Sequence, residues 1–307
     1  MATTKKRPKK KHPTNISDER LELSVSQRKI VLNRFGFIPY STLKLSRGPI
    51  SSKMFKLQAE SPADRGQEYR TSRRKSTGLN AVANYVGQDK ERKALSIMPA
   101  ELVDFFVKYY SDEGQVYLDP FMGQGIQMQV SVLRRRHYYG YDISRRFFDY
   151  IDRVRTKISP TTTTDVHITC GDSRCPNEIP DDIGDFGFTS PPYWDLEWYG
   201  DEPEQLGKAD SYDTFVSLMR DVAKAWLPKF KSGAYYVVNV NDFRRNGRFY
   251  CYHADVIRAH IEAGWEMHDI WIVQELVVGL AKMFAVNSTL KRIAPRCHEY
   301  ALVFRAP

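Results

Sequence analysis

One short segment of the sequence combines a rigid backbone with polar and aromatic side chains: Thr189-Ser190-Pro191-Pro192-Tyr193-Trp194-Asp195. The two prolines restrict the chain, so we expect the Ser190 hydroxyl and the Pro191 carbonyl to point the same way, beside the Tyr193 ring. Two such acceptors take hydrogen bonds from both protons of an amino group and free the lone pair of an otherwise weakly nucleophilic aromatic amine. Ser190, Pro191, Pro192 and Tyr193 are therefore the predicted catalytic residues for attack by an exocyclic amine.

Side chains near this segment are suited to holding a nucleic-acid base. A base inside a duplex must flip out before its amino group can react, and we expect Tyr193 and Trp194 to hold it by stacking. Asp195 is a candidate acceptor for a cytosine amino group, although an acidic residue here also caps a following helix. Arg244 and Arg245 follow a predicted strand at the same edge of the sheet and are candidate phosphate contacts; a solvated turn explains them equally well.

A second segment, Asp119-Pro120-Phe121-Met122-Gly123-Gln124-Gly125, directly follows an apolar strand-like run. Its two glycines permit a tight strand-to-helix turn that a ligand can approach closely. No GK[ST] follows, and the third glycine of the dinucleotide fingerprint is missing. The turn therefore predicts binding of a ligand without a phosphate clamp, through Asp119, Phe121, Gly123 and Gly125.

Two further acids each follow a predicted strand. Asp142 lies about 20 residues beyond the glycine turn, where a carboxylate accepts hydrogen bonds from ribose hydroxyls. Asp172 is placed to accept from an adenine amino group, and both acids also suit helix capping. Together with the glycine turn they predict a cofactor with a ribose and an adenine, which S-adenosyl-L-methionine satisfies.

The elements that must position these segments alternate along the chain. Strands are expected over residues 116–118, 138–141, 166–170, 186–189, 234–240, 266–274 and 298–304, and helices over 99–110, 126–136, 144–157, 212–230 and 253–263. This alternation predicts an α/β fold with a doubly wound, mostly parallel sheet. In that architecture ligands bind at the carboxyl ends of the strands, where the segments above begin.

Charge is distributed unevenly along the 307 residues. The net charge is +9, yet residues 1–80 hold 19 Lys or Arg and 6 Asp or Glu, a net of +13, so the remainder carries −4. We expect a disordered basic tail over 1–18, a small basic extension and linker with possible DNA contact over 19–80, and the catalytic domain over 81–307. A basic arm on an acidic body favours a polyanion partner, while a merely solubilising tail is the alternative.

The absence of certain sequence patterns excludes several classes of protein. The sequence has no apolar run of membrane-spanning length and no secretory pattern, so we expect no membrane association and a cytoplasmic location. The four cysteines lack paired spacing, which predicts free thiols and no metal site. A C5-cytosine methyltransferase needs a Pro-Cys nucleophile and a zinc deaminase needs an H-x-E and P-C-x-x-C arrangement. The sequence contains no Pro-Cys pair and therefore neither arrangement.

Residues 96–305 resemble the DNA amino-methyltransferase family of SPPY-type N4-cytosine and N6-adenine methylases, through the glycine motif DPFMGQG and the catalytic motif TSPPY. The resemblance is closer to phage-type DNA modification methylases, in FGFIPYSTL, SPPYWDLEWYGDEPEQL and VNDFRRNGRFY. It implies a Rossmann-like methyltransferase fold with a seven-stranded sheet and the cofactor S-adenosyl-L-methionine.

The same resemblance implies methylation of an exocyclic amino group in double-stranded DNA by base flipping. Serine at position 190 favours N4-cytosine over N6-adenine, and a restriction or phage modification partner is possible in such families. Gln124 departs from the small residue common there. Three alternatives stay open: the same fold acting on RNA, acting on a protein amide, or serving as an inactive nucleic-acid-binding homologue.

Overall fold

The computed structural model describes residues 29, 30, 33, 41–44, 98–158, 163–196, 199–274, 290–294 and 297–307. The chain divides into two compact units, residues 1–40 and 41–307, and the fold below is that of the second unit. The predicted basic tail lies outside the described residues, as does most of the predicted extension and linker. The proposed divisions after residues 18 and 80 stay predictions.

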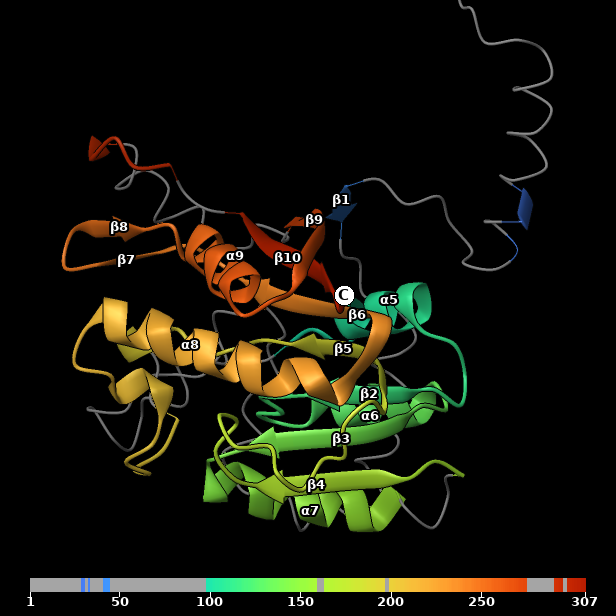
Figure 1. Cartoon of the computed structure of the whole chain (residues 1–307). Helices are drawn as coiled ribbons and strands as arrows, with labels where there is room; N and C mark the ends of the chain where they lie inside the picture. The colour runs from blue at the N-terminus through green and yellow to red at the C-terminus, as the bar shows by residue number, and fades with distance from the viewer. Residues whose placement is uncertain are drawn as a thin grey trace, which may run out of the picture. The chain divides into compact units, whose positions relative to one another are not determined.

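The core of this unit is an eight-stranded sheet in the order β1-β9-β10-β6-β5-β2-β3-β4 (Figure 1). All neighbouring strands are parallel except β10, which runs antiparallel between β6 and β9. The strands are β1 (Thr42–Lys44), β2 (Val116–Asp119), β3 (His137–Asp142), β4 (Val166–Cys170), β5 (Gly184–Thr189), β6 (Phe230–Val240), β9 (Glu266–Gln274) and β10 (His298–Arg305). The seven predicted strands are all present, and β1 adds a short edge strand.

Helices cover both faces of the sheet, as buried parallel strands require. They are α5 (Ala100–Tyr110), α6 (Ile126–Leu133), α7 (Arg145–Ile158), α8 (Tyr212–Trp226) and α9 (Tyr252–Glu262). The structure thus confirms the predicted doubly wound, mostly parallel α/β fold. No helix in the described part of the chain has the length and apolar character to cross a bilayer.

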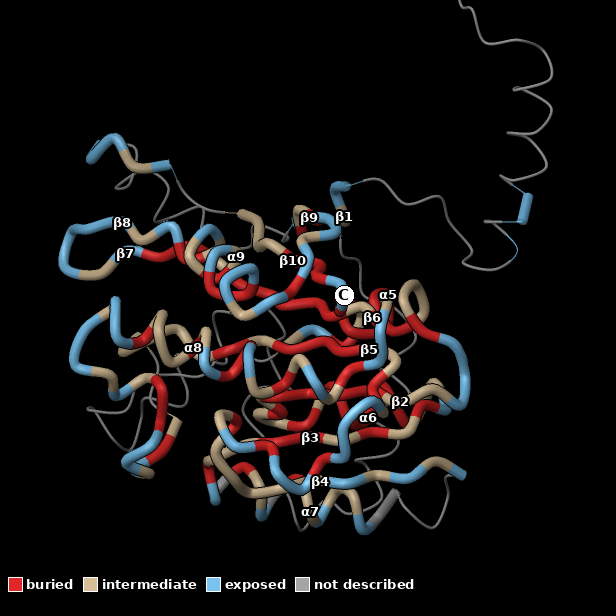
Figure 2. The backbone as a smooth tube through the Cα atoms, in the orientation of Figure 1, coloured by how far each residue is buried: buried red, intermediate tan, exposed pale blue. Residues whose placement is uncertain are grey.

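Alternating side chains of the central strands build a core on each face. On the α5 face, Phe106 stacks on Phe188 of β5 with ring centroids 5.6 Å apart. On the opposite face, Trp226 of α8 is fully buried in one cluster with Tyr236 and Val238 of β6. Figure 2 shows the central strands as mostly buried and the edge strand β4 as more exposed. The middle of the sheet is therefore the rigid platform for any loop that follows it.

The chain reverses its direction across the sheet at β2. From β2 it passes to β3 and β4 on one side, and then returns to β5 and β6 on the other. This reversal creates the switch point at which doubly wound folds bind ligands. The glycine turn, Asp142, Asp172 and Ser190 each follow one of the four parallel strands around it, so they emerge at one edge.

Two details differ from the prediction. Strand β6 starts at Phe230 because α8 ends at Trp226 and a short 3-10 turn containing Pro228 follows. The predicted loop at 243–250 is a β-hairpin, β7 (Phe243–Arg245) and β8 (Arg248–Tyr250). Its two turn residues have positive φ angles, 51° at Asn246 and 79° at Gly247, as a tight two-residue hairpin requires.

Candidate active site

Residues at the ends of four different strands, or directly after them, line one open hollow. The sequence predicted six of them: Phe121, Gly123, Asp142, Asp172, Ser190 and Pro192. The other lining residues were not predicted: Ile143, Ser173, Tyr199, Gln205 and Leu206. Two segments therefore share one site: the glycine turn, residues 119–125, and the segment 190–193, which we call the proline corner. They are 65 or more residues apart in sequence.

The glycine turn leaves space at the floor of this hollow. Gly123 has φ of 49°, and a Cβ placed on it would meet only the Phe121 carbonyl oxygen, at 4.0 Å. Gly125 has φ of 72° and begins α6, where a Cβ would press on Ile151 at 3.0 Å. Gly123 thus keeps open space beside the backbone, whereas Gly125 permits α6 and α7 to pack closely.

Asp142 at the end of β3 is held by backbone donors. Its Oδ2 accepts from the Gly123 N–H at 2.8 Å, and its Oδ1 accepts from the Ser144 N–H at 2.8 Å. Burial raises the pKa of this carboxyl to about 6, against the lowering effect of these two bonds. The remaining lone pairs of both oxygens are suited to accept from two adjacent hydroxyls.

Asp119 does not line the hollow, because it lies fully buried beneath it. Its Oδ1 accepts from Thr189 Oγ1 at 2.7 Å and its Oδ2 accepts from Tyr138 Oη at 2.8 Å. Burial raises its pKa to about 7, and hydrogen bonds from Thr189, Tyr138 and Phe121 offset part of the effect. Asp119 therefore ties the glycine turn to the strand that leads into the proline corner, instead of facing a ligand.

Asp172 lines the hollow but already has a cation beside it. Its carboxylate forms a salt bridge with Arg174 at 2.5 Å. The neighbouring Ser173 donates from its hydroxyl to the Pro120 carbonyl, and its own carbonyl accepts from Trp226 Nε1 at 2.8 Å. The loop after β4 is thereby fixed to both the glycine turn and α8.

The proline corner lies against an aromatic cluster. Ser190 and Pro192 line the hollow, whereas Pro191 is buried. The Pro192 carbonyl accepts from Tyr252 Oη at 3.0 Å. The Tyr193 ring packs edge-on against Tyr252, with centroids 5.8 Å apart. These contacts hold the corner in one conformation next to the floor formed by Gly123.

Trp194 lies in packing contacts on the outer side of the corner. Its Nε1 donates to the Ala209 carbonyl at 3.0 Å, and its ring contacts Tyr212 and Tyr250 at centroid distances of 5.8 Å each. Its φ of 45° is unusual for a side chain of this size. The backbone passes so close to Gly207 that a Cβ there would lie 2.6 Å from the Trp194 oxygen. The structure places Trp194 as an anchor of the loop, outside the lining of the hollow.

Asp195 and Arg245, both predicted to contact substrate, contact each other. Arg245 Nη2 lies 2.6 Å from Asp195 Oδ2. The second oxygen, Oδ1, is buried and has no hydrogen-bond partner among the described residues. Arg244 lies on the hairpin with its guanidinium 5.0 Å from the Phe249 ring. The structure thus joins the corner to the hairpin through one ion pair.

The sequence did not predict that Tyr199, Gln205 and Leu206 line the hollow. Their loop, residues 199–206, is positioned by a contact with a residue distant in sequence. Glu202 accepts from the Arg145 N–H at 3.0 Å and from Gln205 Nε2 at 2.9 Å. The loop is thereby fixed beside the start of α7, and Gln205 and Leu206 close one wall. No pattern in the sequence signals this path, because it depends on a contact between residues 57 positions apart.

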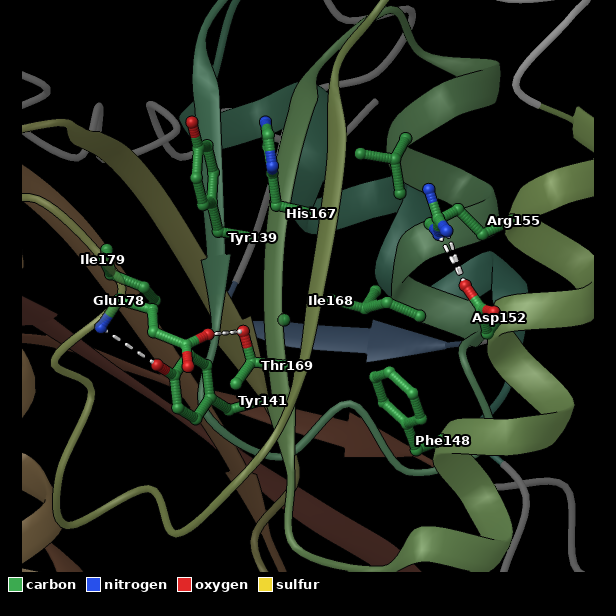
Figure 3. Close-up of a pocket in the computed structure, with 12 residues that line it drawn as sticks. Tyr139, Tyr141, Phe148, Asp152, Arg155, His167, Ile168, Thr169, Glu178 and Ile179 are labelled. Carbon is green, nitrogen blue, oxygen red and sulfur yellow. Dashed lines mark hydrogen bonds and ion pairs between the residues drawn. The ribbon is translucent and has the colours of Figure 1, made fainter.

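A larger hollow near the outer edge of the sheet does not include the predicted residues. Figure 3 shows that its lining comes from both sides of β4, with His167 and Thr169 on one side and Ile168 and Phe148 on the other. Because the strand divides these side chains, they do not converge on one ligand position. Among the described residues, no group of three His, Cys, Asp or Glu is arranged to hold a metal ion.

The sheet is Rossmann-like, as the resemblance implied, with the antiparallel β10 inserted between β6 and β9. A family model described as DNA methylase matches residues 4–153. This match bears out the resemblance stated for residues 96–305 over the shared residues 96–153, which include the glycine turn and end before the proline corner.

Individual relatives cover less of the chain. The orphan methyltransferase M.BamHII of Bacillus amyloliquefaciens is 35% identical over 54 residues, 18% of this chain and 20% of its own. The type II methyltransferase M.MthZI of Methanothermobacter thermautotrophicus is 32% identical over 76 residues, 25% of this chain and 21% of its own. This chain thus spans about a fifth of the length of each. The solved structure of TrmN from Thermus thermophilus gives a TM-score of 0.47 at 13% identity, covering 68% of this chain and 49% of that one.

Proposed function

We propose that this protein is an S-adenosyl-L-methionine-dependent DNA methyltransferase that modifies the exocyclic amino group of a base, with N4 of cytosine as the favoured position. One observation carries the proposal: Ser190 and Pro192 line the same hollow as Gly123 and Asp142. Methyl transfer to an amine requires the cofactor and the amine acceptors to lie side by side. The similarity to DNA methylases over residues 4–153 supports the substrate class.

The residues of the hollow fit the proposed cofactor. The space beside Gly123 admits a ligand against the backbone, and Asp142 has lone pairs for two ribose hydroxyls. Asp172 and the Phe121 side chain lie in the same lining for the adenine. When bound, the cofactor supplies an electrophilic methyl group.

This chain's residues then position the amine. Ser190 Oγ and the Pro191 carbonyl accept hydrogen bonds from the two amine N–H groups, which directs the nitrogen lone pair into the hollow. After the methyl group has transferred, the nitrogen releases one of these protons to solvent. The Pro192 carbonyl is held by Tyr252, so the preceding carbonyl is the one assigned to the amine. Tyr193 stacks on the flipped base, and the buried Asp195 Oδ1 is a further acceptor at its edge.

Mass spectrometry of nucleosides tests the proposal directly. The full chain is expressed in a host that lacks DNA methylation, and its DNA and RNA are hydrolysed separately. We expect N4-methylcytosine in the DNA, and its loss when Ser190→Ala replaces the wild type. N6-methyladenine in the DNA would correct the position while keeping the reaction. Methylation confined to RNA, or its absence from both nucleic acids despite cofactor binding, would refute the proposal.

A further inference from the structure

The β7–β8 hairpin presents two chemically different faces. The strands pair Phe243 with Tyr250, Arg244 with Phe249, and Arg245 with Arg248. Because side chains alternate across a strand, Arg244 and Phe249 share one face, and the other two pairs share the opposite face. Each face of the hairpin can therefore make its own set of contacts.

The face that carries Phe243, Tyr250 and Arg245 packs against the proline corner. Phe243 is buried and packs against Tyr193, with ring centroids 6.4 Å apart. Tyr250 contacts Trp194, and Arg245 forms its ion pair with Asp195 at 2.6 Å. These contacts fix the hairpin to the residues that are proposed to hold the base.

The other face carries an exposed aromatic ring with a cation beside it. Phe249 is 41% exposed, and the Arg244 guanidinium lies 5.0 Å from its ring centroid. The segment 243–250 holds three arginines and no acidic residue. Figure 1 shows the hairpin projecting from the body beside α9, on the side of the sheet to which the β3 arrow points, and Figure 2 shows its tip as exposed.

Phe249 is connected to the corner through the docked face of the hairpin. It adjoins Tyr250, whose ring lies 5.1 Å from Phe243, which in turn contacts Tyr193. An apolar side chain that enters a base step unstacks it and opens the space from which a base can flip.

We propose that the β7–β8 hairpin docks on the DNA duplex beside the target base, with Phe249 inserted against the base stack and Arg244 on a phosphate. Arg245 acts as a positioning residue that fixes the hairpin to Asp195. This inference rests on the proposed function for its substrate. DNA is the partner because a cationic face with an exposed aromatic ring, next to the corner proposed to hold a flipped base, complements a polyanion with stacked bases.

Plasmid unwinding tests the insertion of Phe249 without knowledge of the recognition sequence. Closed circular DNA is relaxed by a topoisomerase in the presence of bound protein, and the change in linking number is measured per bound molecule. The wild type is expected to unwind the plasmid, Phe249→Ala to lose most of the unwinding, and Phe249→Trp to retain it. Ile261→Ala is the matched control, because Ile261 is 51% exposed on α9 and away from the hairpin. Equal unwinding by wild type and Phe249→Ala, or none by the wild type, would overturn the insertion.

Salt dependence tests the phosphate contact. Binding of a labelled duplex of mixed sequence is measured by fluorescence anisotropy over a range of salt. Removing one phosphate contact should lower the slope of log K against log salt by about one, so Arg244→Ala is expected to show this change. Arg258→Ala, at a side chain 64% exposed on α9, is the control and should keep the wild-type slope. An unchanged slope for Arg244→Ala would overturn that contact.

Kinetics separate this inference from the proposed function. Phe249→Ala should lower kcat/KM for methyl transfer to duplex DNA by about tenfold or more, given the energy of unstacking a base step. Its affinity for S-adenosyl-L-methionine should stay at the wild-type level. If the wild type binds and unwinds DNA but transfers no methyl group, the proposed function fails and the hairpin inference stands. If it methylates DNA and Phe249→Ala does so equally fast, only the hairpin inference fails.

Discussion

The buried carboxyl of Asp119 should make the stability of this protein depend on pH, and Asp119→Asn should remove that dependence. The side chain is fully buried, and desolvation raises its pKa from 3.8 to about 7. Asparagine has the same shape and never ionises. Its amide oxygen can still accept from Thr189, and its NH₂ can donate to Tyr138.

The direction of this pH dependence follows from which state, folded or unfolded, binds the proton. Between the two pKa values, 3.8 and about 7, the folded protein keeps a proton that the unfolded chain has lost. The contribution of Asp119 to stability is therefore complete below 3.8 and declines as the pH rises through about 7. The slope is about 1.4 kcal/mol per pH unit near pH 5 and about half of that at pH 7, where the folded carboxyl is half ionised. Over this range the free energy of unfolding of Asp119→Asn should rise relative to wild type by about 2 kcal/mol.

Urea unfolding of both proteins across this pH range measures the difference, and the other titrating groups cancel in it. Asp181→Asn is the control, because Asp181 is 68% exposed beside Lys229 and its ion pair contributes about 1 kcal/mol or less. Parallel stability curves for wild type and Asp119→Asn would show that Asp119 titrates as a hydrated carboxyl. The burial of this residue beneath the glycine turn would then be wrong.

Three further changes test the site and its support. Tyr193→Ala should lower methyl transfer by about 10- to 100-fold, because base stacking contributes about 1–3 kcal/mol, while cofactor binding measured by calorimetry persists. Asp142→Ala should weaken cofactor binding; since the pKa of Asp142 is about 6, wild-type affinity should also fall below that pH, and Asp142→Asn should lack this dependence. Trp226→Ala should destabilise the protein by about 3–5 kcal/mol in urea unfolding, because the indole is fully buried.

The order of the elements was predictable because short strand-like segments alternate along the chain with longer segments of helical apolar periodicity. The predicted strands at 166–170 and 266–274 agree with β4 and β9 at both ends. The start of β6 was not predictable, since Phe230-Lys231-Ser232-Gly233 has no strand pattern of its own. It is drawn into the sheet by pairing of Phe230 with Gly184 and by the bond from Gly233 N–H to the Ala306 carbonyl at 2.9 Å.

The part of the candidate site that directly follows strands was also predictable, because the fold brings strand ends together. The positions of two kinds of residue were not predictable. Asp119 has the sequence context of a ligand contact, yet its side chain turns into the core toward Thr189, which only the packing decides. The hairpin carried a turn signal in Asn246-Gly247, but arginines stand where alternating apolar residues normally mark the strands.

The contact of Asp119 and the contact of the hairpin together fix the position of the proline corner. On its inner side the corner is tied to the glycine turn through Thr189 and Asp119, and on its outer side it is tied to the hairpin through Asp195 and Arg245. An amine acceptor is effective only when its position is fixed within a fraction of an ångström. Because Ser190 lies between both links, displacement of either the cofactor turn or the hairpin moves the acceptors. The proposed chemistry therefore depends on contacts from both sides. A loss of either link should reduce methyl transfer, because Asp119, Thr189 and Arg245 fix the position of the corner without touching the reacting atoms.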